Sequence, residues 1–173
     1  MVLRDSGERV VPEWIGPADR MGFMLLEQHR QRYEIASSDI RGKRVLDLGC
    51  GAGYGAHSMA DSGAERVTAV DVDSAALAYA FDNYSHPAIE YIQHDATTFT
   101  PDPGAYDLVT CFEVLEHVDQ PQALLEVIRS ALKPTGRLLI SGCVYPTQDF
   151  YRFHVRDYSK ASFRAELEAG GFD

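Results

Sequence analysis

The chain lacks a long hydrophobic run. Within its 173 residues, no apolar stretch approaches the ~18 residues that a membrane-spanning helix needs. The opening residues, Met1 to Ser6, also lack the hydrophobic segment of a secretory signal peptide. We therefore expect no membrane span and a cytoplasmic location.

Cysteine and positive charge are scarce as well. The three cysteines, Cys50, Cys111 and Cys143, lie in or beside expected strands, so we expect reduced core thiols and no disulfide framework. Lys and Arg number 16 against 26 Asp and Glu, which gives a formal charge of −10. A protein that binds nucleic acid by neutralising phosphates usually has the opposite balance, so nucleic acid is not the expected partner.

What is present fits one globular domain. From Lys43 onward, short β-rich runs alternate with helical patterns, which is typical of a parallel sheet flanked by helices. One predicted helix begins after Asp119, its expected N-cap, and stops at 133–136. Strands are predicted at 44–48, 66–70, 89–92, 106–111 and 137–140, and further helices at 54–61, 74–83 and 159–169.

The first 40 residues differ from the rest. Pro12 and Pro17 bracket a loop that contains Trp14, and a single helix is expected from Ala18 to Ser37. We interpret 1–40 as a loop and helix that either cover a site or simply pack on the sheet edge. Residues 41–173 then form the domain that holds the site.

A glycine-rich turn follows the first predicted strand, in Val45-Leu46-Asp47-Leu48-Gly49-Cys50-Gly51-Ala52-Gly53-Tyr54-Gly55. Glycines let the chain turn sharply and let a ligand approach the backbone, and the next helix presents free N–H groups. A nucleotide-like ligand is indicated. Because 51–56 also fits the looser dinucleotide pattern, the glycines leave a choice between NAD and S-adenosylmethionine.

Two carboxylates narrow this choice. Asp71 ends the second predicted strand about 20 residues after the glycines, where an acidic side chain can accept hydrogen bonds from ribose hydroxyls. Asp47 lies inside the glycine motif, where a negative charge would face the pyrophosphate of a dinucleotide. Of the two candidate ligands, the cationic S-adenosylmethionine therefore fits better than NAD.

With these residues, the sequence from Lys43 to the end resembles the class I S-adenosylmethionine-dependent methyltransferases. Similar motifs are 45–53, 67–73, 91–96, 112–118 and 132–138. The resemblance implies a doubly wound, Rossmann-like α/β fold with a mostly parallel sheet. It also implies a cofactor site formed by Asp47, Gly49, Cys50, Gly51, Gly53, Asp71, Val72, Asp95, Ala96, Phe112 and Glu113.

The same resemblance makes the end of the chain unusual. In that family a sixth and a seventh strand follow the helix that ends near Gly170, and here the sequence stops at Asp173. We expect these two strands to be missing. The open edge of the fifth strand then predicts a truncated chain prone to association or a homo-oligomer.

For a hydroxyl acceptor, His117 and His154 are the candidate catalytic bases, without a metal, because both follow strands at the ligand-binding edge. An alternative is open: 113–117 is similar to the E-x-x-E-H metal motif of small-RNA 2′-O-methyltransferases, and His154 would complete a metal site with Glu113, Glu116 and His117. Further alternatives are an NAD dehydrogenase and a non-catalytic domain that binds the cofactor.

A narrower resemblance concerns the acceptor. Gly7–Glu13, Glu27–Tyr33 and Phe153–Ser159 look like a methyltransferase subgroup associated with bacterial surface-polysaccharide and sugar pathways, although Gln28 departs from its pattern. This implies a sugar, nucleotide-sugar or glycan acceptor. Two interpretations are open for the basic residues Arg30, Arg32, Arg41, Lys43, Arg44, Arg152 and Arg156: they hold the phosphates of such an acceptor, or, for most of them, they are solvated surface charges.

Overall fold

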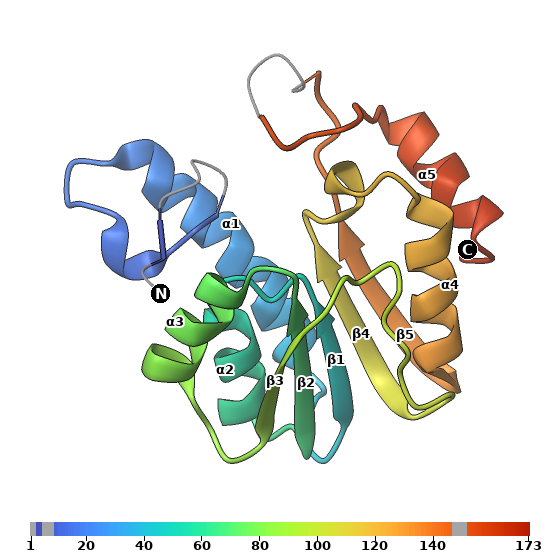
Figure 1. The fold of residues 1–173 in the computed structure, drawn as a ribbon, viewed down its shortest axis with the longest axis horizontal. Coiled ribbons are helices and arrows are strands. Elements are labelled where there is room, and N and C mark those ends of the chain that lie inside the picture. The colour runs from blue at the N-terminus through green and yellow to red at the C-terminus, as the bar shows by residue number, and fades with distance from the viewer. Residues whose placement is uncertain (1–2, 5–8, 147–151) are drawn as a thin grey trace.

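A computed structural model describes residues 3–4, 9–146 and 152–173. From β1 onward a helix separates each strand from the next, except that β3 is followed directly by β4, and α1 precedes them all (Figure 1). The elements are η1 (Pro12–Trp14), α1 (Arg20–Ser37), β1 (Arg44–Leu48), α2 (Tyr54–Asp61), β2 (Arg66–Asp71), α3 (Ser74–Tyr84), β3 (Ile89–Gln93), β4 (Tyr106–Phe112), η2 (Leu115–His117), α4 (Pro121–Ala131), β5 (Leu132–Ser141) and α5 (Lys160–Ala169).

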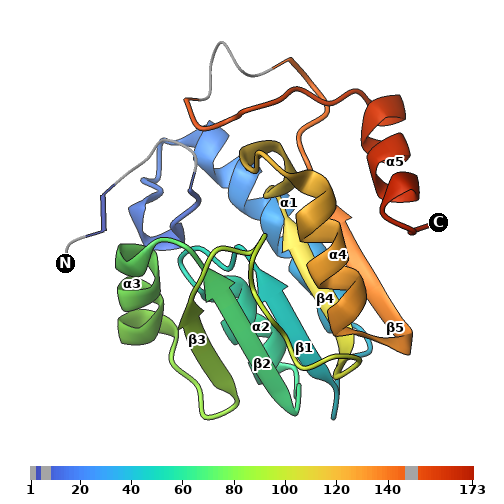
Figure 2. The same ribbon diagram turned by 45° about the vertical axis from the view of Figure 1, so that its right-hand side comes forward.

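The five strands form one parallel sheet in the order β3-β2-β1-β4-β5 (Figure 2). The doubly wound, Rossmann-like α/β fold expected from the sequence is therefore confirmed. β1 pairs with β2 on one side and with β4 on the other, where Leu48 lies opposite Cys111. The chain thus reverses its direction of winding between β1 and β4, and ligands of such sheets bind beyond the carboxyl ends of the strands at that point.

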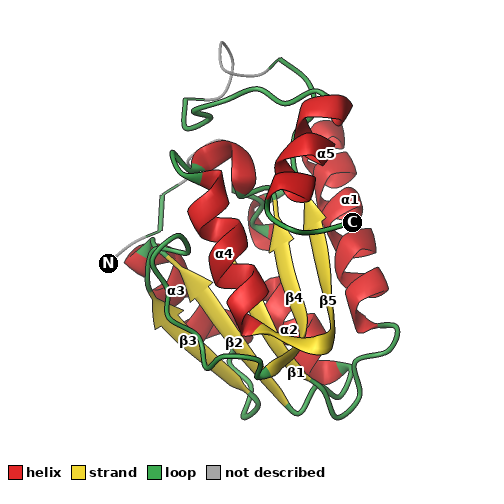
Figure 3. Ribbon diagram, turned by 90° about the vertical axis from the view of Figure 1, so that its right-hand side faces the viewer, coloured by secondary structure: helices red, strands yellow, loops and turns green. Residues whose placement is uncertain are grey.

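Helices cover both faces of the sheet. Val45 and Leu46 are both fully buried, and because neighbouring strand residues point to opposite faces, they belong to two different core clusters. The cluster of Val45 includes Tyr33 from α1 and Met59 from α2, and that of Leu46 includes Leu125 from α4. Figure 3 shows α4 in front of the strands and α2 behind them.

The start of α4 and the start of β5 differ from the prediction. Asp119 is not the N-cap: α4 begins at Pro121 after Gln120, which makes no side-chain cap. Proline at the first helical turn tolerates this, since it has no N–H to satisfy. The helix stops after Ala131 as expected, but β5 begins at Leu132, and residues 133–136 bulge out of the ladder between Tyr106 and Leu108.

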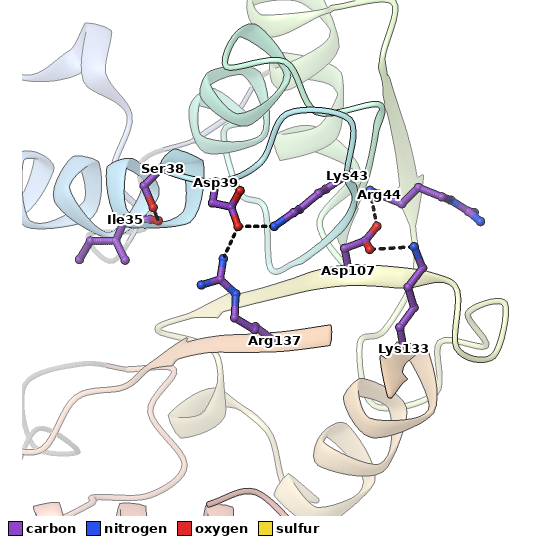
Figure 4. Close-up of polar contacts among 8 residues, drawn as sticks. All are labelled: Ile35, Ser38, Asp39, Lys43, Arg44, Asp107, Lys133 and Arg137. Carbon is purple, nitrogen blue, oxygen red and sulfur yellow. Dashed lines mark hydrogen bonds and ion pairs between the residues drawn. The ribbon is translucent and has the colours of Figure 1, made fainter. Parts of the chain in front are cut away.

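Charged side chains join the amino ends of the strands (Figure 4). Asp107 accepts hydrogen bonds from the Arg44 backbone N–H at 3.0 Å and from Lys133 Nζ at 2.7 Å. Asp39 pairs with Lys43 and, at 3.7 Å, with Arg137. Lys43 and Arg44 therefore lie at the opposite edge of the sheet from the glycine turn, which favours the surface-charge interpretation for these two residues over phosphate binding.

Cys50, Cys111 and Cys143 are free, and the first two lie in the core as expected, whereas Cys143 is only half-buried. Among the described residues, no helix is long and apolar enough to cross a bilayer.

Candidate functional site

A cavity of about 1260 Å³ lies beyond the carboxyl ends of β1, β2 and β4. Small-ligand sites usually measure about 300–1,000 Å³, so this cavity has room for a cofactor and an acceptor together. Nine of the predicted cofactor residues line it: Gly49, Cys50, Gly51, Asp71, Val72, Asp95, Ala96, Phe112 and Glu113.

The glycine turn is close-packed on one side and open on the other. At Gly49, φ is +76°, and an added Cβ would lie 2.4 Å from Val114 Cγ2, so only glycine fits. At Gly51, the nearest atom to an added Cβ is on Arg9 at 3.9 Å, which leaves the backbone open to a ligand. Gly53 does not line the cavity: its added Cβ would meet Ala80 at 2.5 Å, so it brings α2 and α3 together instead of contacting a ligand.

Asp71 is held in a fixed orientation at the cavity wall. Its two carboxylate oxygens accept hydrogen bonds from the backbone N–H groups of Gly51 at 2.8 Å and Asp73 at 2.9 Å. A carboxylate offers about four acceptor positions, so two remain for the hydroxyls of a ribose. Val72, beside it, is 67% exposed and offers an apolar surface that a flat base would cover. These residues fit the ribose and base of a nucleoside cofactor.

Asp47 is placed differently from the prediction. It is 1% exposed, does not line the cavity, and accepts hydrogen bonds from the hydroxyls of Thr110 at 2.7 Å and Tyr33 at 3.4 Å. Burial raises the pKa of its carboxyl to about 7, although both hydrogen bonds lower it. Asp47 thus acts from beneath the glycine turn, where its side chain does not reach a bound ligand directly.

Glu113 follows β4 in a strained backbone conformation. Its φ of +54° is in the left-handed region, which is uncommon for a residue other than glycine and is often found at functional sites. Ser141 Oγ donates to its Oε1 at 2.7 Å, and Arg32 Nη2 lies 3.2 Å from the same oxygen. Both contacts fix the carboxylate at the floor of the cavity, beside Phe112.

The two predicted catalytic histidines are brought together. His117 lines the cavity, and the ring of His154, which does not, meets it edge to face at a centroid distance of 4.6 Å. Nδ1 of His117 lies 3.1 Å from the carbonyl oxygen of Phe153. A carbonyl only accepts, so Nδ1 carries the proton and Nε2 holds a lone pair.

Several residues before position 40 line the cavity, and none of them is among the cofactor-binding or catalytic residues expected from the sequence. They are Arg4, Arg9, Val10, His29 and Tyr33. Nδ1 of His29 lies 3.0 Å from the hydroxyl of Tyr54, and burial lowers the pKa of His29 to about 4, so the ring is neutral at pH 7. His29 and Tyr33 are four residues apart on one helix face, a spacing that could have indicated a shared environment.

The comparison with known families decides the assignment. Residues 23–172 match a family model described as a methyltransferase domain. The chain belongs to this family. The class I resemblance of the sequence is thereby confirmed, and S-adenosylmethionine is the cofactor of this methyltransferase domain.

Two curated relatives of the chain are ubiquinone biosynthesis O-methyltransferases. The chain is 43% identical over 142 residues to the mitochondrial ubiquinone biosynthesis O-methyltransferase of Schizosaccharomyces pombe, covering 79% of this chain and 48% of the relative. It is 33% identical over 132 residues to the ubiquinone biosynthesis O-methyltransferase of Coxiella burnetii, covering 75% of this chain and 56% of the relative. The methyltransferase domain therefore spans about half the length of these relatives.

Solved structures share the fold. An S-adenosylmethionine-dependent methyltransferase from Mesorhizobium loti has a TM-score of 0.70 at 19% identity, covering 83% of this chain and 80% of that chain. A phosphoethanolamine N-methyltransferase from Haemonchus contortus, in complex with phosphomonomethylethanolamine and S-adenosylhomocysteine, has a TM-score of 0.70 at 23% identity and covers 84% of this chain and 37% of that chain. At these identities the likeness concerns the fold alone.

Proposed function

We propose that the chain transfers the methyl group of S-adenosylmethionine to a hydroxyl of a small-molecule acceptor. The observation that carries this proposal is one cavity with two unlike walls. Asp71 and the open backbone at Gly51 form the wall that suits a nucleoside, and His117 presents a ring nitrogen from the other.

When bound, S-adenosylmethionine supplies a methyl group on a positively charged sulfur. Asp71 would hold the ribose, and Asp95 and Ala96 would hold the base, so that the cofactor and its sulfur–methyl bond would be kept in place. Holding the acceptor in line with that bond supplies much of the rate through proximity and orientation. His117 Nε2 takes the hydroxyl proton as the O–C bond forms, and the sulfur keeps the electron pair of the broken S–C bond.

A phenolic hydroxyl is the acceptor that we propose first. The relatives named above are O-methyltransferases of ubiquinone biosynthesis, and aromatic side chains of Tyr33, Tyr54, Phe112 and Phe153 line the cavity. Flat rings pack well against such side chains.

A sugar hydroxyl is the second acceptor, which follows from the narrower sequence resemblance. Arg4 and Arg9 line the cavity and favour an anionic sugar derivative, although Arg9 also pairs with Asp73 at 3.0 Å. Gly7 and Glu8 of that resemblance lie outside the described residues. The role of 1–40 as a cover and the cytoplasmic location both stay predictions.

Two measurements test the function. Calorimetry on the untagged chain should show binding of S-adenosylmethionine and S-adenosylhomocysteine and none of NAD. Radiolabelled cofactor should then transfer its methyl group to a catechol, with UDP-sugars, monosaccharides and a short RNA as competing acceptors. Preference for NAD would contradict the cofactor assignment. Tight cofactor binding with no transfer to any acceptor would favour the non-catalytic alternative.

A further inference from the structure

Three metal-ligating side chains meet beside the cavity: Glu116, His117 and His154. One donor atom from each lies within 4.8 Å of the other two. Among the described residues, this is the only cluster of three or more metal-ligating side chains. Two metal–ligand bonds of about 2.1 Å separate opposite donors by at most ~4.2 Å. The three donor atoms therefore draw closer together when an ion binds.

The strongest sign of a missing partner is on Glu116. Its side chain is 1% exposed, and Oε1 accepts a hydrogen bond from the Cys143 backbone N–H at 2.8 Å. Oε2 is also buried and has no hydrogen-bond partner. An unpaired buried carboxylate oxygen is costly, and burial raises the pKa of Glu116. A cation at the cluster would satisfy this oxygen.

The backbone holds the donors together. Glu116 and His117 are neighbours in η2, and the N–H of Val155, next to His154, donates to the carbonyl of Glu116 at 2.9 Å. Nδ1–H of His117 is directed at the Phe153 carbonyl, and metal-ligating histidines almost always donate their second ring N–H in this way. The arrangement therefore holds the two segments that carry the donors together.

Glu113 is not part of the cluster. Its Oε1 is occupied by Ser141 and Arg32. The structure therefore does not assemble the four-residue set that the sequence alternative named. It assembles one carboxylate and two imidazoles.

We propose that Glu116, His117 and His154 bind a divalent transition-metal ion. Two nitrogen donors favour Zn²⁺, Co²⁺ or Fe²⁺ over Mg²⁺ or Ca²⁺, and three protein ligands leave coordination positions open. Since His117 lines the cavity, an open position faces the acceptor. In this role, which rests on the proposed function, the ion lowers the pKa of the acceptor hydroxyl. In the metal-bound protein the ion thus activates the hydroxyl and the proton leaves to solvent, whereas in the metal-free protein His117 takes that proton.

Cobalt binding tests the site without any acceptor or cofactor. Titration of the untagged, metal-free chain with Co²⁺ should give visible absorption bands that saturate at one equivalent. Glu116→Gln keeps the side-chain shape and an acceptor for Cys143 N–H but loses a carboxylate ligand. This variant and His154→Ala should each bind Co²⁺ at least about tenfold more weakly. Circular dichroism should show both variants folded.

His57→Ala is the matched control, because His57 lies 3.4 Å from Asp61 in a second histidine–carboxylate group on the surface. It should bind Co²⁺ as the wild type does. Absence of a one-equivalent complex, unchanged binding by Glu116→Gln, or loss of binding in His57→Ala would each overturn the proposal. Calorimetry with S-adenosylmethionine on the same samples tests the proposed function separately, because Asp71 and the glycine turn remain intact in all of them.

Discussion

Asp47 is a carboxylate with almost no access to solvent, and its protonation is coupled to folding. Burial raises its pKa to about 7, against about 4 in an unfolded chain. Between these values the folded state binds more protons, so the free energy of unfolding falls as pH rises through this window and stays low above pH 7. The buried charge therefore destabilises the protein at neutral and alkaline pH.

Asp47→Asn should remove this dependence. Its amide oxygen still accepts from Thr110. Between pH 5 and pH 8 the wild type should lose about 2 kcal/mol of unfolding free energy relative to the variant. Urea unfolding at both pH values measures the difference, and Asp82→Asn, at an exposed helix position, is the control. Parallel pH profiles for wild type and Asp47→Asn would show that Asp47 titrates normally.

Asp71→Ala should weaken cofactor binding. The substitution removes hydrogen bonds between a charged carboxylate and the ribose. A hydrogen bond to a charged group contributes about 1.5–3 kcal/mol, and its loss raises Kd roughly 10- to 150-fold. It also removes the acceptor that holds the Gly51 N–H. Calorimetry with S-adenosylhomocysteine measures the loss, with Asp82→Ala as a control on α3. Undiminished affinity in Asp71→Ala would contradict its assigned contact with the ribose.

Most of the predicted site residues could be assigned from sequence because they lie in the turns that directly follow β1, β2 and β4. Strand ends meet at one edge of a parallel sheet, so their position follows from the alternation of elements. Asp47 and Gly53 were assigned to the ligand because of the motif they belong to. Which way a side chain points, and what lies behind a glycine, depends on packing with distant elements such as Tyr33 and Ala80.

Helices α1 and α2 are in contact at a glycine. An added Cβ at Gly55 would lie 2.0 Å from Cζ of Tyr33. Tyr33 is itself fixed, since it is buried, contacts Phe112 edge to face at 5.1 Å and donates to Asp47. The ring therefore has little freedom to move aside, and α2 approaches α1 this closely only because residue 55 has no side chain.

Gly55→Ala should therefore destabilise the domain, although alanine favours helix. Overpacking typically costs about 1–3 kcal/mol, which exceeds the helix-propensity gain of about 1 kcal/mol from replacing glycine. Thermal unfolding should show a melting temperature several degrees lower. Gly16→Ala is the matched control, because an added Cβ there meets nothing within 4 Å. Equal melting temperatures for the two variants would mean that Tyr33 moves aside freely.

Element boundaries were predictable where local signals end them. Asp73 caps α3 through a hydrogen bond to Ala75 N–H, and Ser159 caps α5. The start of β5 was not predictable, because residues 133–136 look like an ordinary turn. They form a bulge because Tyr106 pairs with Leu132 and Leu108 pairs with Arg137. A strand that is distant in sequence sets that register, so the local sequence does not predict it.

In the whole molecule, the order of the strands in the sheet follows from the way the chain connects them. Crossovers between parallel strands are right-handed, and a chain that places helices on both faces must reverse at one strand. The alternation of predicted elements therefore indicated the architecture and the position of the cavity. It did not indicate how α1 contributes His29 and Tyr33 to the cavity wall, because no sheet pairing links α1 to the strands.

β5 is the end strand of the sheet, and no described strand pairs with its outer edge. Its apolar residues Leu138, Leu139 and Ile140 are only half-buried. An apolar, unpaired edge invites pairing with another chain, whereas β3, at the other end, carries the ion pair of Glu90 with Arg66.

We expect this chain to self-associate through β5. Light scattering behind size exclusion should show mass rising with concentration, and hydrogen exchange should slow in β5 but not in β3. A constant monomer mass with unchanged β5 exchange would contradict the expectation.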